Sequence, residues 1–181
     1  RMKVSPDADF EASADLVIRV PANVELALYV GVGEVDATAT TRGLRLETFS
    51  GHVRTSGTRG PLLIDTGSGD VEVTRHSGDL SVDTGSGAID VSDVTNAGRI
   101  SLDTGSGAVI ATRCSASEKL VIDTGSGEIT AREVEAPVMS MDTGSGSVEV
   151  GPTTEAGSLH VDTGSGGVTL IAPDMPWMIW S

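Results

Sequence analysis

Apolar and polar residues alternate along most of this chain, in short runs separated by glycine-rich turns. Two apolar residues flank one other residue before a turn, as at Leu80 and Val82. The same spacing returns after the turn, as at Ile89 and Val91. A period of two is the spacing of a β-strand with one buried face, because successive side chains point to opposite sides. The pattern therefore predicts an all-β protein built from short strands.

The turn between these runs is the same five residues, Asp-Thr-Gly-Ser-Gly, in six places. Successive copies are separated by steps of 18, 20, 20, 19 and 20 residues. Repetition at such a period is typical of a solenoid, in which each unit stacks on the one before it. The copies begin at the aspartates that we expect to be structural turn residues, namely Asp65, Asp83, Asp103, Asp123, Asp142 and Asp162.

Two weaker copies of the unit precede these six. Residues 44–51 and 26–33 keep the alternation, with Glu47 and then Tyr29 at the position of the aspartate. Together they predict about eight coils, and residues 16–20 look like a lead-in strand that covers the first coil. A second, more variable corner between coils takes up the differences in repeat length, as expected of an outer loop.

Identical residues at identical places favour stacked coils over a row of antiparallel hairpins. In parallel coils each threonine lies on a threonine and each glycine on a glycine, about 4.8 Å apart. A hairpin meander would have no reason to repeat its tips. The sequence therefore predicts a single-stranded parallel β-helix, or β-solenoid, of about eight 18–20-residue coils.

Composition supports this architecture and limits the function. Aromatic residues make up only 3% of the 181, so the core must consist of aliphatic side chains, and 23 glycines suit many tight turns. The net charge of −14 disfavours binding to nucleic acid or to anionic lipid. Cys114 is the one cysteine, which excludes a disulfide within the chain. No apolar run is long enough to span a membrane.

The Asp-Thr-Gly-Ser-Gly motif allows three interpretations. Asp-Thr-Gly between apolar strands resembles the active-site string of aspartic proteases, but that chemistry needs two facing carboxylates, not six in a line. Stacked acidic turns also resemble the calcium-binding β-roll, although one carboxylate per turn is few for an ion that takes six to eight oxygens. We favour a structural role, in which the aspartate accepts hydrogen bonds from backbone N–H groups two or so residues on.

Elsewhere the sequence contains no arrangement typical of catalysis. The three histidines form no close pair, and His52 and His160 fall at outward positions of the alternation. The chain has no nucleophile elbow, phosphate loop or Cys/His cluster. We therefore expect no catalytic residue, metal ion, cofactor or small-molecule substrate, and a protein as the partner.

The C-terminal residues differ from the repeats, because both tryptophans of the chain lie there. One interpretation is a cap over the last coil, since open solenoid ends expose apolar surface. The other is a docking segment, with Trp177, Met178 and Trp180 as contact residues. The sequence thus divides into an N-terminal extension (1–15), the β-solenoid (16–172) and this tail (173–181).

Several strings resemble a known family. Val17-Ile18-Arg19-Val20-Pro21 and serial Ser-Gly-x-Val units, such as Ser68-Gly69-Asp70-Val71, look like bacterial adhesin-type β-solenoid domains of unknown function, similar to auto-transporter adhesin heads. The resemblance covers roughly residues 16–172. It implies a right-handed β-helix in the cell envelope, often attached to a membrane segment, and no catalytic residues.

Two functions are consistent with these observations. One is an adhesin-like scaffold in the periplasm or at the cell surface, and the other is an accessory subunit on the extracytoplasmic face of a membrane protein complex. A calcium-binding module is a further alternative. Association with a membrane is expected to be indirect, or through a segment outside this sequence.

Overall fold

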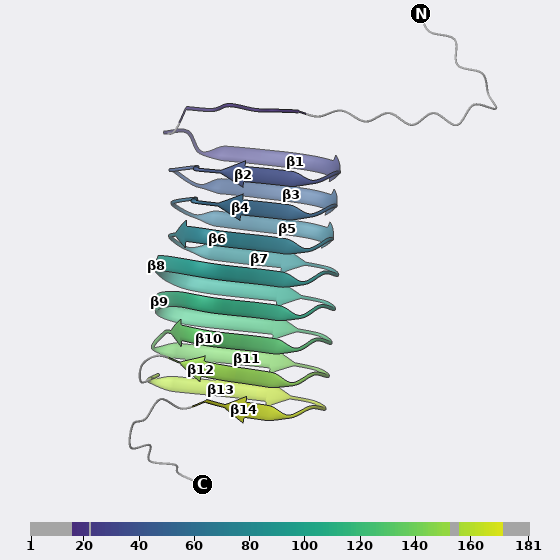
Figure 1. The fold of residues 1–181 in the computed structure, drawn as a ribbon, viewed down its shortest axis with the longest axis vertical. Coiled ribbons are helices and arrows are strands. Elements are labelled where there is room, and N and C mark those ends of the chain that lie inside the picture. The colour runs from purple at the N-terminus through teal and green to yellow at the C-terminus, as the bar shows by residue number, and fades with distance from the viewer. Residues whose placement is uncertain (1–15, 22, 153–155, 172–181) are drawn as a thin grey trace, which may run out of the picture.

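A computed structural model describes residues 16–21, 23–152 and 156–171 of the chain. The strands stack into a straight rod, with β1 near one end and β14 at the other (Figure 1). The first row of strands contains β1 (Leu26–Val32), β3 (Leu44–Ser50), β5 (Leu62–Ser68), β7 (Leu80–Thr84), the second halves of β8 (Ile89–Thr104) and β9 (Val109–Thr124), β11 (Val138–Thr143) and β13 (Ser158–Thr163). The second row contains β2 (Val35–Thr38), β4 (Val53–Ser56), β6 (Val71–Ser77), the first halves of β8 and β9, β10 (Ile129–Glu135), β12 (Val148–Pro152) and β14 (Val168–Leu170).

Every strand pair in the structure is parallel, which confirms the solenoid and excludes the hairpin meander. The register is the one that the repeat predicts, because Asp65 lies beside Asp83 and Thr66 beside Thr84. The weaker copies keep it too, with Tyr29 beside Glu47. The motif corner leads from the first row to the second, and β8 and β9 continue through the second corner into the first row (Figure 1).

The solenoid has about seven turns, one fewer than expected from the sequence. The eight strands of the first row are separated by only seven steps, from Leu26 to Leu159, and this explains the lower number of turns. The expected lead-in strand is also wrong. Residues 16–20 form no strand, and Leu16 and Val17 are 79% and 77% exposed.

The core is a set of parallel columns of small aliphatic side chains. Leu80 and Val82 in one row face Ile89 and Val91 in the other, and all four are buried. The columns continue through successive coils, so each apolar side chain packs on its equivalents above and below. A further buried column at the second corner, not expected from the sequence, contains Thr58, His76, Val94, Cys114 and Val134.

Candidate functional site

The threonine of the motif is an internal residue, although it lies next to a solvent-exposed aspartate. Thr104 is 1% exposed, and its hydroxyl donates a hydrogen bond of 3.0 Å to the carbonyl oxygen of Gly87 in the preceding coil. Thr124 makes the same bond to Gly107, and Thr143 makes it to Gly127. Such bonds join neighbouring coils at the motif corners from Thr84 to Thr163 and satisfy hydroxyl groups that burial would otherwise leave without a partner, whereas Thr66 donates to the carbonyl of Ser68 in its own coil.

The motif glycines are required because backbone stacks directly on backbone at this corner. A Cβ atom added to Gly125 would lie 2.5 Å from the carbonyl oxygen of Gly105, and one added to Gly144 would lie 2.6 Å from that of Gly125. Such distances are far below van der Waals contact. From Gly67 onward the preceding coil therefore dictates a glycine at this position, whereas Phe49, in register with Gly31, departs from the rule.

The motif aspartates form a row of carboxylates on the outer side of the first row of strands. Asp83, Asp103 and Asp123 lie in register in adjacent coils and are exposed. The Asx-turn expected from the sequence does not form, because no carboxylate of the motif accepts a hydrogen bond within the described coils; the threonines close the corner instead. Partial burial, followed by repulsion from Asp123 and Asp83, raises the pKa of Asp103 above the ordinary carboxyl value.

Two other aspartates accept hydrogen bonds from backbone N–H groups, but these groups belong to the following coil. The Oδ1 atom of Asp70 accepts a 2.8 Å bond from the N–H of Ala88. At the second corner, the Oδ1 atom of Asp79 accepts bonds of 2.7 Å and 3.1 Å from the N–H groups of Gly98 and Arg99. Neither interaction was expected from the sequence, although each aspartate precedes a strand at a corner, where free N–H donors are available.

The arrangement of ionisable groups bears on the metal and protease interpretations. Among the described residues, no three His, Cys, Asp or Glu side chains converge in a way that could hold a metal ion. The motif carboxylates stand in line along one side and do not face each other as a protease dyad would. His52 lies 3.5 Å from Asp70 on the surface, and His160 is exposed as predicted. Burial raises the pKa of the Cys114 thiol to about 11, which keeps it protonated.

Six successive coils, from Ala39 to Glu133, each have one second-row residue in the left-handed backbone region. Residues with φ between 53° and 58° include Arg75, Asp93, Arg113 and Glu133, one in each of four successive coils. Their charges alternate in sign. Arg113 donates from Nε and from a terminal nitrogen to the two oxygens of Asp93, at 2.6 Å and 3.1 Å, and this contact lowers the pKa of Asp93.

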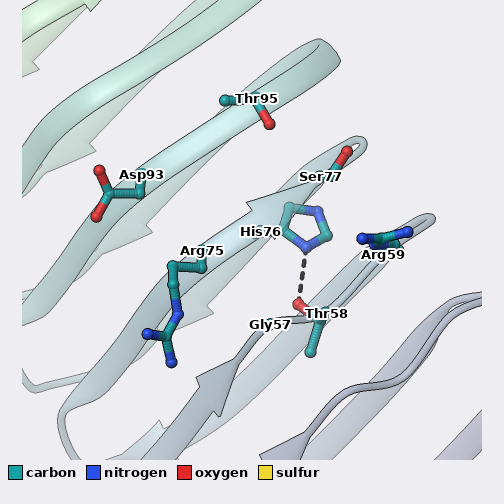
Figure 2. A pocket seen from close by; sticks show the side chains of 8 residues that line it. All are labelled: Gly57, Thr58, Arg59, Arg75, His76, Ser77, Asp93 and Thr95. Carbon is teal, nitrogen blue, oxygen red and sulfur yellow. Dashed lines mark hydrogen bonds between the residues drawn. The ribbon is translucent and has the colours of Figure 1, made fainter.

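A shallow pocket of about 290 Å³ opens beside this column at the second corner. Figure 2 shows its lining, with the ring of His76 placed between Arg59 and Arg75. His76 is 1% exposed; its Nδ1 atom lies 2.8 Å from the hydroxyl of Thr58, and its Nε2 atom lies 3.2 Å from the carbonyl oxygen of Asp79. Because a carbonyl only accepts, Nε2 carries the proton and Nδ1 accepts from Thr58. Burial lowers the pKa of His76, so the ring is neutral.

Exposed large apolar side chains gather at the two ends of the rod. Those near the first coil, within the part of the chain that the structure describes, are Leu16, Val17, Ile18, Val20, Val24, Tyr29, Val32 and Phe49. The last coil exposes Val168, Leu170 and Ile171, while the sides between the ends expose only Ile110 and Val138 among the large apolar residues described. The predicted contact residues Trp177, Met178 and Trp180 lie outside the described residues.

These features define a structural class, a parallel β-solenoid whose corners are held by buried threonines and by backbone-stacked glycines. A family model agrees with this assignment: the chain belongs to the Toastrack DUF4097 family, which matches residues 8–180 and is a β-solenoid family of unknown function. No curated protein and no solved structure matched the chain significantly. The part of the chain that the structure describes contains no helix long and apolar enough to cross a membrane.

Proposed function

We propose that this chain is a non-catalytic interaction protein of the bacterial cell envelope, a β-solenoid scaffold that binds a protein partner through the ends of its rod. The observation that carries the proposal is the distribution of exposed apolar residues. Phe49 and Val32 are 77% and 78% exposed near the first coil, whereas the long sides of the rod expose few such groups. Clusters of exposed apolar side chains mark contact surfaces in soluble proteins.

The charge of the rod supports a division of roles between its ends and its sides. The row from Glu47 to Asp162 places one carboxylate per coil along one side, and the whole chain carries a net charge of −14. Such a side repels further copies of the same chain and attracts basic surfaces. A basic partner would therefore be oriented along the rod while the apolar end supplies the buried contact.

Two versions of this function differ in where the partner resides. In the first, the rod is a free adhesin-like module in the periplasm or at the cell surface that binds external ligands along its side. In the second, it is an accessory subunit on the extracytoplasmic face of a membrane protein complex, docked through an end. The apolar ends favour the second version. A calcium-binding role has no support from the geometry, because the carboxylates of the described residues do not converge.

Capture from native membranes tests the proposal. The full chain carries an affinity tag, and the double variant Val32→Ser and Phe49→Gly removes two exposed apolar side chains of the end surface. Each substitution introduces the residue that later coils hold at that position, as at Ser68 and Gly67, so folding should be retained. Ile110→Thr, on the side of the rod, is the matched control.

We expect the wild type and the control to retain a stoichiometric protein partner, and the double variant to lose it without a change in melting temperature. Recovery of the wild-type chain free of any partner would favour the adhesin version. Equal retention by all three chains would show that this end does not bind. Peptide hydrolysis at acid pH that is abolished by Asp→Asn changes in the motif would overturn the non-catalytic assignment.

A further inference from the structure

The two ends of the rod, formed by β1 and β2 and by β13 and β14, carry complementary strand edges (Figure 1). Among the described residues, β1 pairs only with β3 and β2 only with β4, so the first coil has a free backbone edge. In the last coil, β13 pairs only with β11 and β14 only with β12. Because the coils are parallel and in register, these two edges carry the donors and acceptors that meet at each junction inside the rod.

The first coil already has the glycine that a further coil stacked on it would require. At the register position of Gly31, a Cβ atom in each coil from Gly67 to Gly164 would lie 2.5–2.6 Å from a carbonyl oxygen of the preceding coil. At Gly31 itself, a Cβ atom would meet nothing within 4 Å, and the backbone is outside the left-handed region. Phe49 holds the same register position in the next coil, so the local structure does not demand a glycine.

The charge along the rod favours contact between unlike ends. Residues 16–60 contain five arginines and four acidic residues, whereas an equal length at the other end, residues 127–171, contains one arginine and seven acidic residues. The row of motif carboxylates is also interrupted at the first coil, because Tyr29 stands at the register position of Asp162. A last coil stacked there would place Asp162 beside Tyr29, so no like charges would meet at this position.

Apolar side chains at both ends lack the cover that a neighbouring coil gives them elsewhere. Val168 and Leu170 of the last coil are exposed, whereas their register partners in the preceding coil are buried. In the first coil, Leu26 and Leu28 are only partly buried. Residues 16–21 lie across this end without forming a strand (Figure 1), and no backbone hydrogen bond between described residues joins them to β1 or β2. They therefore leave the strand edge open.

We propose that the rods associate head to tail, with the last coil of one copy stacked on the first coil of a second copy. The contact joins two different surfaces and leaves one of each free, so it builds an open linear array. This inference rests on the proposed function, because it names a second copy as the protein that an end binds. The acidic sides repel each other, which confines the association to the ends.

The end of a single coil is a small surface compared with the roughly 800 Å² per partner of a stable interface. We therefore expect weak association, with a dissociation constant on the order of 100 μM. Sedimentation velocity of the purified full chain, from about 10 μM to about 1 mM, measures it. The mean mass should rise with concentration and pass that of a dimer.

Two variants of β1 test the stacking of coils. Gly31→Val places a side chain where the incoming coil would lie, and it should weaken association roughly tenfold or more without lowering the melting temperature. Ala27→Val is the matched control, because it adds bulk to the same strand at the register position that Val121 holds inside the rod. It should leave association within about twofold. Equal weakening by both variants would contradict the stacked geometry.

A mixing experiment tests which ends meet. Leu170→Lys puts a charge into the last coil, so this variant and Gly31→Val each lack one competent end and should stay monomeric alone. Mixed together, they retain one intact pair of ends and should form a dimer with one copy of each. Dimers of Leu170→Lys alone would overturn the proposal, because two first coils would then bind each other.

A wild-type chain that stays monomeric at every concentration would also overturn this inference. If that chain still retained a different protein from native membranes, the proposed function would stand without it. Self-association of a chain that captures no other protein would support the second copy as the partner of the ends.

Discussion

A single methyl group at a motif glycine should separate two coils of the solenoid. In Gly125→Ala the new Cβ atom would lie 2.5 Å from the carbonyl oxygen of Gly105, whereas ordinary contact begins near 3.4 Å. The coils would have to move apart by about 0.9 Å to remove the clash, at the expense of their van der Waals contact. The hydrogen bond from Gly125 N–H to the carbonyl of Thr104 is already 3.1 Å long and would break.

Overpacking of this kind typically lowers the free energy of unfolding by 1–3 kcal/mol, and the broken hydrogen bond adds about 1 kcal/mol. We therefore expect a loss of about 3 kcal/mol for Gly125→Ala. Gly31 holds the same register position in the first coil, where no preceding coil stacks on it and a Cβ atom meets nothing within 4 Å. Gly31→Ala should change stability by less than about 0.5 kcal/mol.

Urea denaturation followed by far-UV circular dichroism measures both variants. The comparison is direct because the two substitutions are chemically identical and differ only in the coil that lies above. Similar losses in the two variants would refute the reasoning, since the penalty would then arise from glycine's backbone freedom and not from coil stacking. A loss confined to Gly31→Ala would refute it more strongly.

Three further outcomes are expected. Asp103→Asn should raise the free energy of unfolding by about 1 kcal/mol in low salt and by less in high salt, because it removes a charge between two like charges; urea denaturation at both salt concentrations measures this. Burial lowers the pKa of His76, so the unfolded chain binds a proton first and stability should fall as the pH drops below about 6.5. His76→Val, which introduces the residue type of Val94 in the next coil, should remove this component in melts compared at neutral and mildly acidic pH. Ala39 has φ 55° and is exposed, so Ala39→Gly should raise the melting temperature by relieving about 0.5–1 kcal/mol of backbone strain; a lower melting temperature would contradict this.

The sequence predicted the strands and their register because those depend on local patterns. Alternation placed Leu80 and Val82 on the inside, and the spacing of the motif aligned each aspartate with the next. It did not predict how the corner is held, because that depends on contacts between coils. The exposed aspartate looked like the natural hydrogen-bond acceptor, yet the structure uses the adjacent threonine, as at Thr104, to reach the preceding coil.

The second corner was less predictable for the same physical reason. The length of this corner varies from coil to coil. The sequence of one coil therefore does not show which of its corner residues points inward, and only an alignment of the coils does. Alignment places His76 in the column of Val94 and Cys114, which marks it as buried. The arginines of the pocket come from two different coils, and no linear motif joins them.

The motif and the departures from it have different physical origins. From Gly67 to Gly164 a Cβ atom at the first motif glycine would lie 2.5–2.6 Å from a carbonyl oxygen of the preceding coil, so close stacking repeats the requirement for glycine along this part of the rod. A coil departs from the motif where this steric constraint is absent or where a different constraint acts. Phe49 stands at a glycine position near the open end, and Gly57 stands where Arg75 and Asp93 follow. These two departures create the apolar end surface and the opening of the pocket, so a search for partners should start from them and not from the six identical turns.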